Sequence, residues 1–381
     1  MNEISANSQN IPPFIVMEVL ERAHELENEG HHIIHLEIGE PDFTTPDCIC
    51  EAACDAIKRG ETHYTHSLGI IELREAIVWH YKARYGVEIK PDQLMITSGT
   101  SPALFMTFAT LLEQDDEIII SNPHYPCYPN FIRFLGGKAV FVDIAEEDGF
   151  QLRPDAIAQK IGTRTKAVVI NSPSNPTGHI LSKDRMQDIA GMGLPIISDE
   201  IYHGLVYGEQ EHSILEFTDQ AFVLNGFSKL YAMTGWRLGY VIAPHKFIRP
   251  LQKIHQNFLI SASSISQWAG IAALNHAFSD VERMKETYNK RRKYMIQRLR
   301  ELGFRLDNEP SGAFYILVNA RHLASSSYEL AFDILEKAGV GVTPGIDFGQ
   351  NAEGYLRFSY ANSMENIKKG LDRLEKYLRE R

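Results

Sequence analysis

Two spacings of apolar residues alternate along the first two thirds of the chain. Short continuous runs rich in Val and Ile are typical of strands that are covered on both faces. Longer stretches repeat apolar residues every three or four positions, which indicates helices with one buried side. The pattern predicts helices over 14–29, 46–59, 71–85, 102–112 and 183–190, and strands over 94–97, 117–120, 139–142, 167–170, 195–198, 221–224 and 239–242. Because strands and helices alternate, we expect an α/β fold with a mainly parallel sheet.

The pattern changes after Ile265. A long helical stretch over 266–304 is followed by a strand over 312–319, a helix over 327–338, a strand over 354–361 and a last helix from Met364. This order is α+β in character and predicts a second, smaller domain. We place the large domain at 40–285 and the small domain at 1–39 plus 286–381.

Composition and charge narrow the function classes. The 381 residues are 44% hydrophobic and 23% charged, which suits a globular protein of about two domains. A net charge of -11 argues against nucleic acid or an anionic membrane surface as the main partner. The first residues, MNEISANSQNIPPF, show no basic region followed by a long apolar run, and no other run is long enough to span a bilayer. We therefore expect a cytoplasmic protein.

Three of the four cysteines, Cys48, Cys50 and Cys54, fall in one segment, PDCICEAACDAIKRG. A metal or redox cluster is one interpretation, but the spacing is not C-x-x-C and no His/Cys set follows at zinc spacing. We therefore expect no metal site, and thiols buried on a helix that Thr45 caps and Pro46 opens.

In parallel sheets, ligands bind at the carboxyl ends of the strands. The loop after the strand over 94–97 reads Ser98 to Ser101, followed by Pro102. Ser101 suits an N-cap and Pro102 the first helical position, so backbone N–H groups and the helix dipole predict an anion site, most naturally for a phosphate. An ordinary strand-to-helix turn explains this loop equally well.

Three further loops at strand ends carry distinctive side chains. Asp199 ends one strand and Tyr202 follows three residues later. Asn175 lies in NSPSNPTG, where two prolines and a glycine fix the backbone. Lys229 and Arg237 lie in GFSKLYAMTGWRLGY, with no acidic residue between them. A lysine in an apolar, partly dry pocket has a lowered pKa and a nucleophilic amine, and a nearby cation acts in the same direction.

Taken singly, each of these loops is explained by a turn, a core residue or a surface charge. Together they offer an anion cradle, an acid–phenol pair, a rigid amide, and a lysine followed by an arginine. Pyridoxal 5′-phosphate, an aromatic aldehyde with a phosphate, a hydroxyl and a ring nitrogen, needs this set of groups.

The chain resembles the class I/II aminotransferases, pyridoxal-phosphate-dependent enzymes of fold type I related to aspartate aminotransferase. The motifs that carry the resemblance run from residue 36 to 361 in the family's order: LEIGEPDF, YTHSLGIIELREAI, TSGTSPAL, NPHYPCYPNF, NSPSNPTG, SDEIY, FSKLYAMTGWRLGY and GYLRFSYA. The resemblance implies a large domain with a mainly parallel seven-stranded sheet and a smaller α+β domain. It also implies a ping-pong transfer of an amino group from an L-amino acid to a 2-oxo acid, through the pyridoxamine form of the cofactor.

The resemblance also assigns the cofactor contacts. Lys229 is the catalytic residue, which binds the cofactor's aldehyde and then moves a proton. Asp199 pairs with the pyridine nitrogen, and Tyr202 and Asn175 hydrogen-bond the 3′-oxygen. Tyr125 stacks on the ring.

For the phosphate, the resemblance implies contacts from Gly99, Thr100, Ser101 and Arg237. Many relatives carry a further phosphate-binding serine where this chain has Gly226, and whether Ser228 compensates for it stays open. Tyr64 matches a tyrosine that reaches the phosphate of the neighbouring subunit, which implies a homodimer.

For the substrate, the resemblance implies that Arg357 binds the α-carboxylate through two parallel hydrogen bonds. Tyr355 and Ser359 share one face of the predicted strand with Arg357, and a surface arginine on an edge strand is the alternative. Gly39 lets the backbone approach the carboxylate, and Asn175 contacts the substrate as well.

The sequence leaves the substrate side chain open. A dicarboxylate requires a second cation, which some relatives place as a lysine at the position of Ser101 and others as an arginine near KIHQNFLISASS, where this chain has His255. Aspartate, alanine, aromatic and branched-chain donors all remain candidates. A C–S lyase or decarboxylase on the same scaffold is the alternative reaction. A non-catalytic DNA-binding regulator is the remote one, because that class adds a winged helix and suits an acidic chain poorly.

Overall fold

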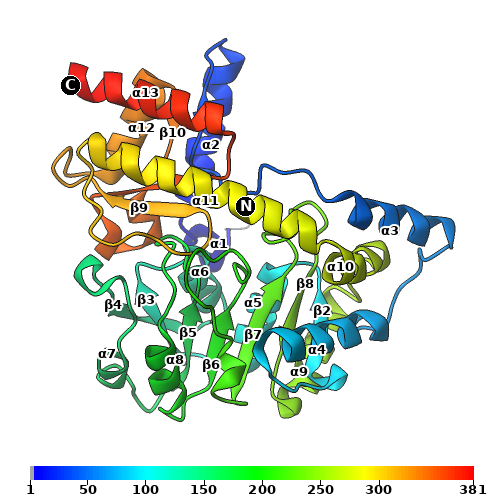
Figure 1. The fold of residues 1–381 in the computed structure, drawn as a ribbon. Helices are drawn as coiled ribbons and strands as arrows, with labels where there is room; N and C mark the ends of the chain where they lie inside the picture. The colour runs from blue at the N-terminus through cyan, green and yellow to red at the C-terminus, as the bar shows by residue number, and fades with distance from the viewer. Residues whose placement is uncertain (1–3) are drawn as a thin grey trace.

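A seven-stranded sheet forms the centre of the larger lobe in the computed structural model, which describes residues 4–381 (Figure 1). Its strand order is β2 (Leu94–Thr97), β8 (Gly239–Ile242), β7 (Ala221–Gly226), β6 (Ile196–Asp199), β5 (Thr165–Asn171), β3 (Glu117–Asn122) and β4 (Lys138–Asp143). Only β8 runs antiparallel to its neighbours β2 and β7. The α/β class and the mainly parallel seven-stranded sheet are therefore confirmed, and every predicted strand is present.

Helices cover both faces of this sheet, which explains why its central strands carry no polar alternation. One apolar core lies under α5 (Thr100–Leu111), α6 (Cys127–Phe134) and α9 (His245–Phe258). The other lies under α4 (Ile71–Tyr85), α8 (Lys183–Ala190) and α10 (Ser264–His276), and continues into the smaller lobe. The remaining short elements here are α3 (Asp47–Lys58), α7 (Pro154–Ala158), η1 (Pro91–Gln93), η2 (Glu146–Asp148) and η3 (Ile214–Glu216).

The starts of two helices differ from the prediction. The hydroxyl of Thr45 donates to the carbonyl of Ala232 (2.6 Å) and does not cap α3, which begins at Asp47. Helix α5 begins at Thr100, because Gly99 adopts φ +94° and turns the chain before Ser101. Ser101 therefore lies in the first turn of α5, where its backbone N–H has no partner within the helix.

The cysteine prediction is correct for the helix and wrong for the burial. Helix α3 buries one side through Ile49, Ala53 and Ala56. Cys54 lies on the exposed side, and Cys48 and Cys50 are half-buried.

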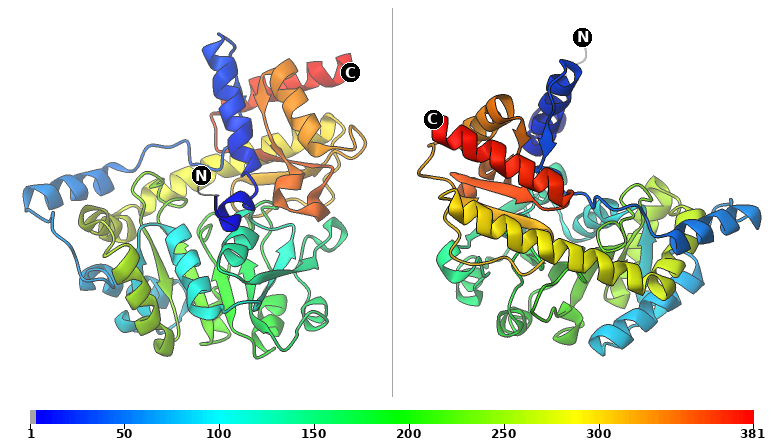
Figure 2. Two further views of the ribbon diagram at one scale, coloured as in Figure 1. Left: turned by 180° about the vertical axis from the view of Figure 1, so that it is seen from behind. Right: turned by 45° about the horizontal axis from the view of Figure 1, so that its top comes forward.

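The smaller lobe is α+β, as predicted. Its three-stranded antiparallel sheet has the order β11 (Thr343–Pro344), β12 (Tyr355–Ser359), β9 (Tyr315–Asn319), and β1 (Ile34–His35) pairs in parallel with β10 (Val340–Gly341). Its other elements are α1 (Ala6–Gln9), α2 (Ile15–Asn28), α12 (Ser327–Ala338), α13 (Met364–Glu380), η4 (Gly345–Phe348) and η5 (Gln350–Ala352). Figure 2 shows α2 standing against this lobe, with its first turn directed at the larger one.

One long helix, α11 (Phe278–Glu301), runs from the larger lobe into the smaller one (Figures 1 and 2). Its Arg291 binds Asp42 through two hydrogen bonds of 2.7 and 2.8 Å, which ties the chain after β1 to the helix. The predicted boundary at 285/286 falls inside this continuous helix, and the domain limits stay a prediction. No helix among residues 4–381 is long and apolar enough to cross a membrane.

Candidate active site

A cavity of about 360 Å³ lies between the two lobes, at the carboxyl ends of β5, β6 and β7. The predicted site residues all line it except Gly99 and Tyr64. Those that do are Gly39, Thr100, Ser101, Tyr125, Asn175, Asp199, Tyr202, Ser228, Lys229, Arg237 and Arg357. Loops that lie far apart in the sequence are thus brought to one space.

The amine of Lys229 lies inside this cavity, just after the end of β7. Its Nζ donates to the carbonyl of Gly39 at 2.6 Å. Burial lowers the pKa of Lys229 to about 8, and the positive charges of Arg357 and Arg237 act in the same direction, while Glu40 opposes them. A substantial fraction of this amine is therefore neutral near pH 8, as the apolar sequence around it predicts.

Asp199 lies at the end of β6 and is buried. Its Oδ2 accepts a hydrogen bond of 2.6 Å from the hydroxyl of Tyr128, and its Oδ1 accepts one of 3.2 Å from the backbone N–H of Ile201. Burial raises the pKa of this carboxyl, and no cation of residues 4–381 forms an ion pair with it. A protonated ring nitrogen would compensate the charge of such a buried carboxylate and donate a hydrogen bond to it.

Tyr128 is a site residue that the sequence reasoning missed. It follows Tyr125 by three positions in NPHYPCYPNF, and the two rings meet edge to face at 5.4 Å. The i, i+3 spacing of two tyrosines at the start of α6 is a signal that could have found it.

A second missed residue is Tyr315, on β9. Its hydroxyl lies 2.9 Å from the hydroxyl of Tyr202. A Cβ at Gly39 would lie 2.1 Å from the same hydroxyl, so glycine is needed there for space. Tyr315 thus connects the predicted cofactor residues to the segment around Gly39 that is predicted to approach the substrate.

The predicted anion cradle is built from closely packed backbone. A Cβ at Gly99 would lie 2.5 Å from Nη2 of Arg237, so the guanidinium lies against the bare backbone of Gly99. A Cβ at Gly239 would lie 2.8 Å from the carbonyl carbon of Gly99 and 2.9 Å from the nitrogen of Thr100. The N–H groups at the start of α5 and the guanidinium beside them suit an anion, which is what the sequence predicts here.

The position of Gly226 has no room for a serine side chain. A Cβ there would lie 2.9 Å from the carbonyl oxygen of Leu238, the residue just before β8. Ser228, which is buried, lines the cavity instead.

Arg357 is fixed on β12, the central strand of the small sheet, and is 3% exposed. Its Nη1 donates to Oδ1 of Asn175 (2.8 Å), and its Nη2 donates to the carbonyl of Glu37 (2.6 Å) and the hydroxyl of Thr343 (3.0 Å). Its Nε has no partner, and no carboxylate of residues 4–381 forms an ion pair with it. The alternative of a surface arginine on an edge strand is therefore wrong.

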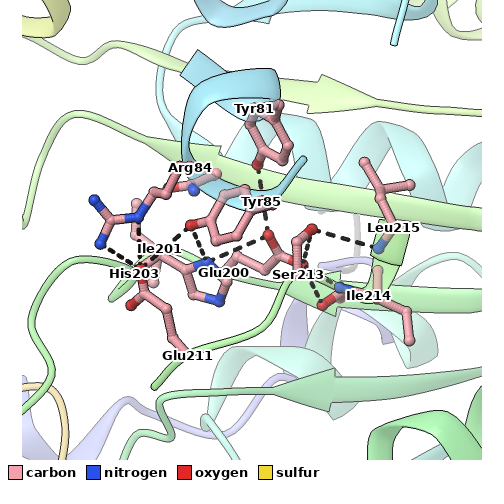
Figure 3. Close-up of polar contacts among 12 residues, drawn as sticks. Tyr81, Arg84, Tyr85, Glu200, Ile201, His203, Glu211, Ser213, Ile214 and Leu215 are labelled. Atoms are coloured by element: carbon pink, nitrogen blue, oxygen red, sulfur yellow. Dashed lines mark hydrogen bonds and ion pairs between the residues drawn. The ribbon is translucent and has the colours of Figure 1, made fainter. Parts of the chain in front are cut away.

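A buried polar network lies behind the turn that carries Asp199 and Tyr202 (Figure 3). Oε1 of Glu200 accepts hydrogen bonds of 3.0 Å from the hydroxyls of Ser198 and Ser213 and from the backbone N–H of Ile214.

At the other end of the same turn, Oε2 of Glu211 accepts a hydrogen bond of 2.7 Å from the backbone N–H of Gly204, and Arg84 pairs with the same carboxylate. Nothing local in the sequence predicts these contacts, which hold both ends of the turn between residues 199 and 204.

Two predicted residues lie elsewhere. Gly99 is buried behind the guanidinium of Arg237 and not in the cavity wall. Tyr64 is 82% exposed and outside the cavity of its own subunit.

The remaining wall is largely apolar, with Glu40, Asn171 and Thr234 as its other polar residues. Phe14 and three residues of α2, Val16, Met17 and Leu20, line the cavity together with Leu104. The ring of Phe14 meets Tyr125 edge to face at 6.2 Å. Among residues 4–381, the cations at this cavity are Lys229, Arg237 and Arg357.

The sequence model of the family "Aminotransferase class I and II" matches residues 31–374. The chain belongs to the class I and II aminotransferases. It is an enzyme that transfers amino groups, and the family is generally dependent on pyridoxal phosphate.

Relatives of this aminotransferase share nearly its whole length. It is 43% identical to the (5-formylfuran-3-yl)methyl phosphate transaminase of Methanocaldococcus jannaschii, over 98% of this chain and 99% of that one. It is 40% identical to the aspartate aminotransferase of Pyrococcus horikoshii, over 95% of this chain and 94% of that one. The structure of the Thermus thermophilus aspartate aminotransferase with maleate superimposes with a TM-score of 0.95 at 36% identity, covering 99% and 100% of the two chains. The fold of this aminotransferase is therefore fold type I.

The lowered pKa of Lys229 predicts a pH profile for its reaction with an aldehyde. In the cofactor-free aminotransferase, the rate at which Lys229 reacts with added pyridoxal phosphate should rise up to about pH 8 and then level off, because the neutral amine is the nucleophile. An ordinary lysine, with a pKa of about 10.4, would continue to gain reactivity beyond pH 9. Stopped-flow absorbance between pH 6 and 10 measures this rate, with Lys229→Ala as the blank. A profile that still rises beyond pH 9 would contradict the assignment.

A substitution at Gly239 tests how closely the anion cradle is packed. Replacement by alanine should weaken the affinity for pyridoxal phosphate by about tenfold or more, because the new methyl group displaces the backbone of Gly99 and Thr100. The matched control is Gly235→Ala in the neighbouring loop, where no atom lies within 4 Å of the new Cβ. Equilibrium dialysis gives both dissociation constants, and equal values for the two variants would rule out the cradle.

Proposed function

We propose that this aminotransferase holds pyridoxal 5′-phosphate on Lys229 and moves the amino group of an L-amino acid with an apolar or aromatic side chain to a 2-oxo acid. The observation that carries the choice of substrate is the apolar wall of Phe14, Val16, Met17, Leu20 and Leu104, in the same cavity as a buried arginine that has no carboxylate partner among residues 4–381.

The residues of the cavity suit the cofactor. The bare backbone at Gly99 and the guanidinium of Arg237 suit its phosphate. The buried carboxylate of Asp199 suits a protonated ring nitrogen, and the phenol of Tyr202 suits the 3′-oxygen. When bound, pyridoxal phosphate supplies the electron-withdrawing ring that makes loss of the Cα proton feasible.

The chain's own residues then bind the substrate and move the proton. Arg357 fixes the α-carboxylate, because two guanidinium N–H groups match two carboxylate oxygens and no carboxylate of residues 4–381 forms an ion pair with it. Lys229 accepts the proton from Cα and returns it, a task for which a pKa of about 8 is suitable. Tyr128 holds Asp199 in place through its 2.6 Å hydrogen bond.

The cavity suits an apolar substrate side chain better than a second carboxylate. Burying a carboxylate without a cation is costly, and Lys229, Arg237 and Arg357 already have tasks. Ser101 stands where some relatives have a lysine. His255, the other candidate, is fully buried, hydrogen-bonds the carbonyl of Ser67 at 2.7 Å and has its pKa lowered by burial, so it is neutral.

A phosphorylated aromatic aldehyde is a second candidate substrate, as the amino acceptor. The Methanocaldococcus jannaschii relative is named for such a compound. An unpaired guanidinium binds a phosphate in the same bidentate way as a carboxylate, and an apolar wall suits a flat ring.

We also propose that the enzyme is a homodimer in which Tyr64 of one subunit completes the phosphate site of the other. Tyr64 and Phe258 are 82% and 76% exposed. The two segments adjoin, because the hydroxyl of Ser67 accepts hydrogen bonds from Gln252 and Gln256. Arg237 also faces an open groove beside the cavity. Exposed rings around an open site are the features that a second subunit would cover. The cytoplasmic location stays a prediction.

A half-reaction screen tests the substrate class. The pyridoxal form should react with phenylalanine and leucine with a kcat/KM about 100-fold above that for aspartate, because an unpaired distal carboxylate costs roughly 3 kcal/mol in this wall. Loss of the pyridoxal absorbance measures each reaction, and (5-formylfuran-3-yl)methyl phosphate is offered to the pyridoxamine form as an acceptor. Aspartate reacting as well as phenylalanine would refute the apolar assignment, and release of ammonia or a thiol would indicate a lyase.

Arg357→Leu in the same screen separates the two ends of the substrate. It should raise KM by about 100-fold for every amino acid, because each one has the α-carboxylate. Arg321→Leu, which removes an exposed guanidinium of the same lobe, is the control. An effect on one class of amino acid alone would contradict the role.

Subunit mixing tests the dimer. Homodimers of Lys229→Ala should be inactive, and homodimers of Tyr64→Ala should bind pyridoxal phosphate weakly. In a refolded mixture, about a quarter of the sites combine an intact Lys229 with an intact Tyr64 from the other chain, so tight cofactor binding and activity should return to that extent. No recovery above the two separate homodimers would overturn the shared site.

A further inference from the structure

Helix α2 forms part of the cavity wall, yet its own sequence does not cap its first turn. Phe14 occupies the cap position and has no side-chain oxygen to offer. The first N–H groups of an uncapped helix lack intrahelical partners and need an acceptor from elsewhere.

The carboxylate of Asp347 provides that acceptor from more than 300 residues away in the sequence. The backbone N–H of Ile15 donates to its Oδ1 at 3.0 Å, and that of Val16 donates to its Oδ2 at 3.3 Å. Asp347 lies in η4 and is 9% exposed. A carboxylate at this place both satisfies two N–H groups and complements the helix dipole.

The element that carries Asp347 is also attached to the carboxylate-binding arginine. The strand just before it pairs Thr343 with Arg357. The ring of Phe348 lies 4.9 Å from the guanidinium carbon of Arg357, and its carbonyl accepts a hydrogen bond of 2.9 Å from the backbone N–H of His124. One short segment therefore links the arginine, the loop before Tyr125 and the first turn of α2.

We propose that Asp347 is a positioning residue for the substrate side chain: it holds the first turn of α2 so that Val16 and Met17 face the cavity. This inference rests on the proposed function, in which an apolar side chain packs against that wall. Asp347 touches neither substrate nor cofactor and acts only through the helix.

The carboxylate of Asp347, which latches the first turn of α2, loses its charge at mildly acidic pH. Burial raises the pKa of Asp347 to about 6, while its hydrogen bond from Ile15 and the charge of Arg357 act against the rise and Glu18 adds to it. Of the groups on the neighbouring loop and helix, burial lowers the pKa of His124 to about 4 and raises the pKa of Cys127, so both are neutral between pH 5 and 7.

Protonation loosens the first turn of α2 without lowering global stability. The folded chain binds this proton more tightly than the unfolded chain, so acidification through pH 6 does not unfold the protein through Asp347. It removes the charge and one acceptor from the first turn of α2, which loosens locally.

Amide hydrogen exchange in the cofactor-free enzyme tests whether Asp347 holds the first turn of α2, and this measurement does not depend on catalytic activity. In Asp347→Asn, the amides at the start of α2 should exchange about tenfold faster at pH 8 than in the wild type. The matched control is Glu336→Gln, which removes the exposed contact of a carboxylate with Arg22 on the same helix, far from its first turn. Asp347→Ala, which removes both acceptor oxygens, is the second variant and should give a larger increase than Asp347→Asn, whose amide keeps one acceptor. Unchanged exchange in both Asp347 variants would overturn the inference.

Kinetics of the loaded enzyme test the positioning. Asp347→Asn should raise KM for phenylalanine about fivefold to tenfold at pH 8 and leave KM for alanine nearly unchanged, because the methyl group of alanine does not reach the wall. The ratio of wild-type to variant kcat/KM for phenylalanine should fall toward one at pH 5, where the wild-type carboxylate is protonated. Equal losses for alanine and phenylalanine, or a ratio that does not change with pH, would show that Asp347 is only structural. A wild type that reacts with no apolar donor would instead refute the proposed function, and the exchange result would still decide whether the latch exists.

Discussion

The structure is organised around three cations, Lys229, Arg237 and Arg357, that face one cavity, where Glu40 and Asp199 are the acidic side chains among the described lining residues. Arg357 has no carboxylate partner among the described residues, and the amine of Lys229 has its pKa lowered by burial and by two neighbouring guanidinium groups. Unpaired charge of this kind is unfavourable in a folded protein unless an external anion completes it. An anionic cofactor and an anionic substrate are the groups that do so in a family of aminotransferases. The cavity therefore favours anionic ligands, and this preference for negative charge is the first element of its specificity.

The fold places these charges by the geometry of parallel strands. Asp199 and the segment leading to Lys229 follow neighbouring strands, β6 and β7, so the acid and the amine emerge side by side at one edge of the sheet. Arg357 comes from the other lobe, on the central strand of a separate small sheet. The large lobe therefore fixes the residues proposed to hold the cofactor, and the small lobe fixes the arginine proposed to bind the substrate carboxylate. Asn175 bridges the two through its hydrogen bond with Arg357.

The sequence predicted what is encoded locally. The strand ends, the small residues before α5 and the apolar surroundings of Lys229 are readable from adjacent residues, and the class of fold followed from them. The starts of α3 and α5 were misplaced because a tertiary contact of Thr45 and the positive φ of Gly99 override the usual cap preferences.

Residues that act over long sequence separations were not predictable from one sequence. Tyr315 meets Tyr202 from 113 residues away, and Asp347 meets Ile15 from 332 residues away. Glu200 also sits in a network that only the folded turn assembles (Figure 3). A single sequence carries no signal for such pairs, because their spacing is set by the fold and not by helical or strand periodicity.

Gly226 links parts of the site that lie far apart in the sequence. A side chain at residue 226 would meet the carbonyl of Leu238 and the backbone of Gly239, and a Cβ at Gly239 would in turn meet the backbone of Gly99 and Thr100. A larger residue at 226 would therefore require β8 to move, and that movement would disturb the turn before α5. The end of β7, the start of β8 and the start of α5 thus constrain one another, and none of the three can change alone.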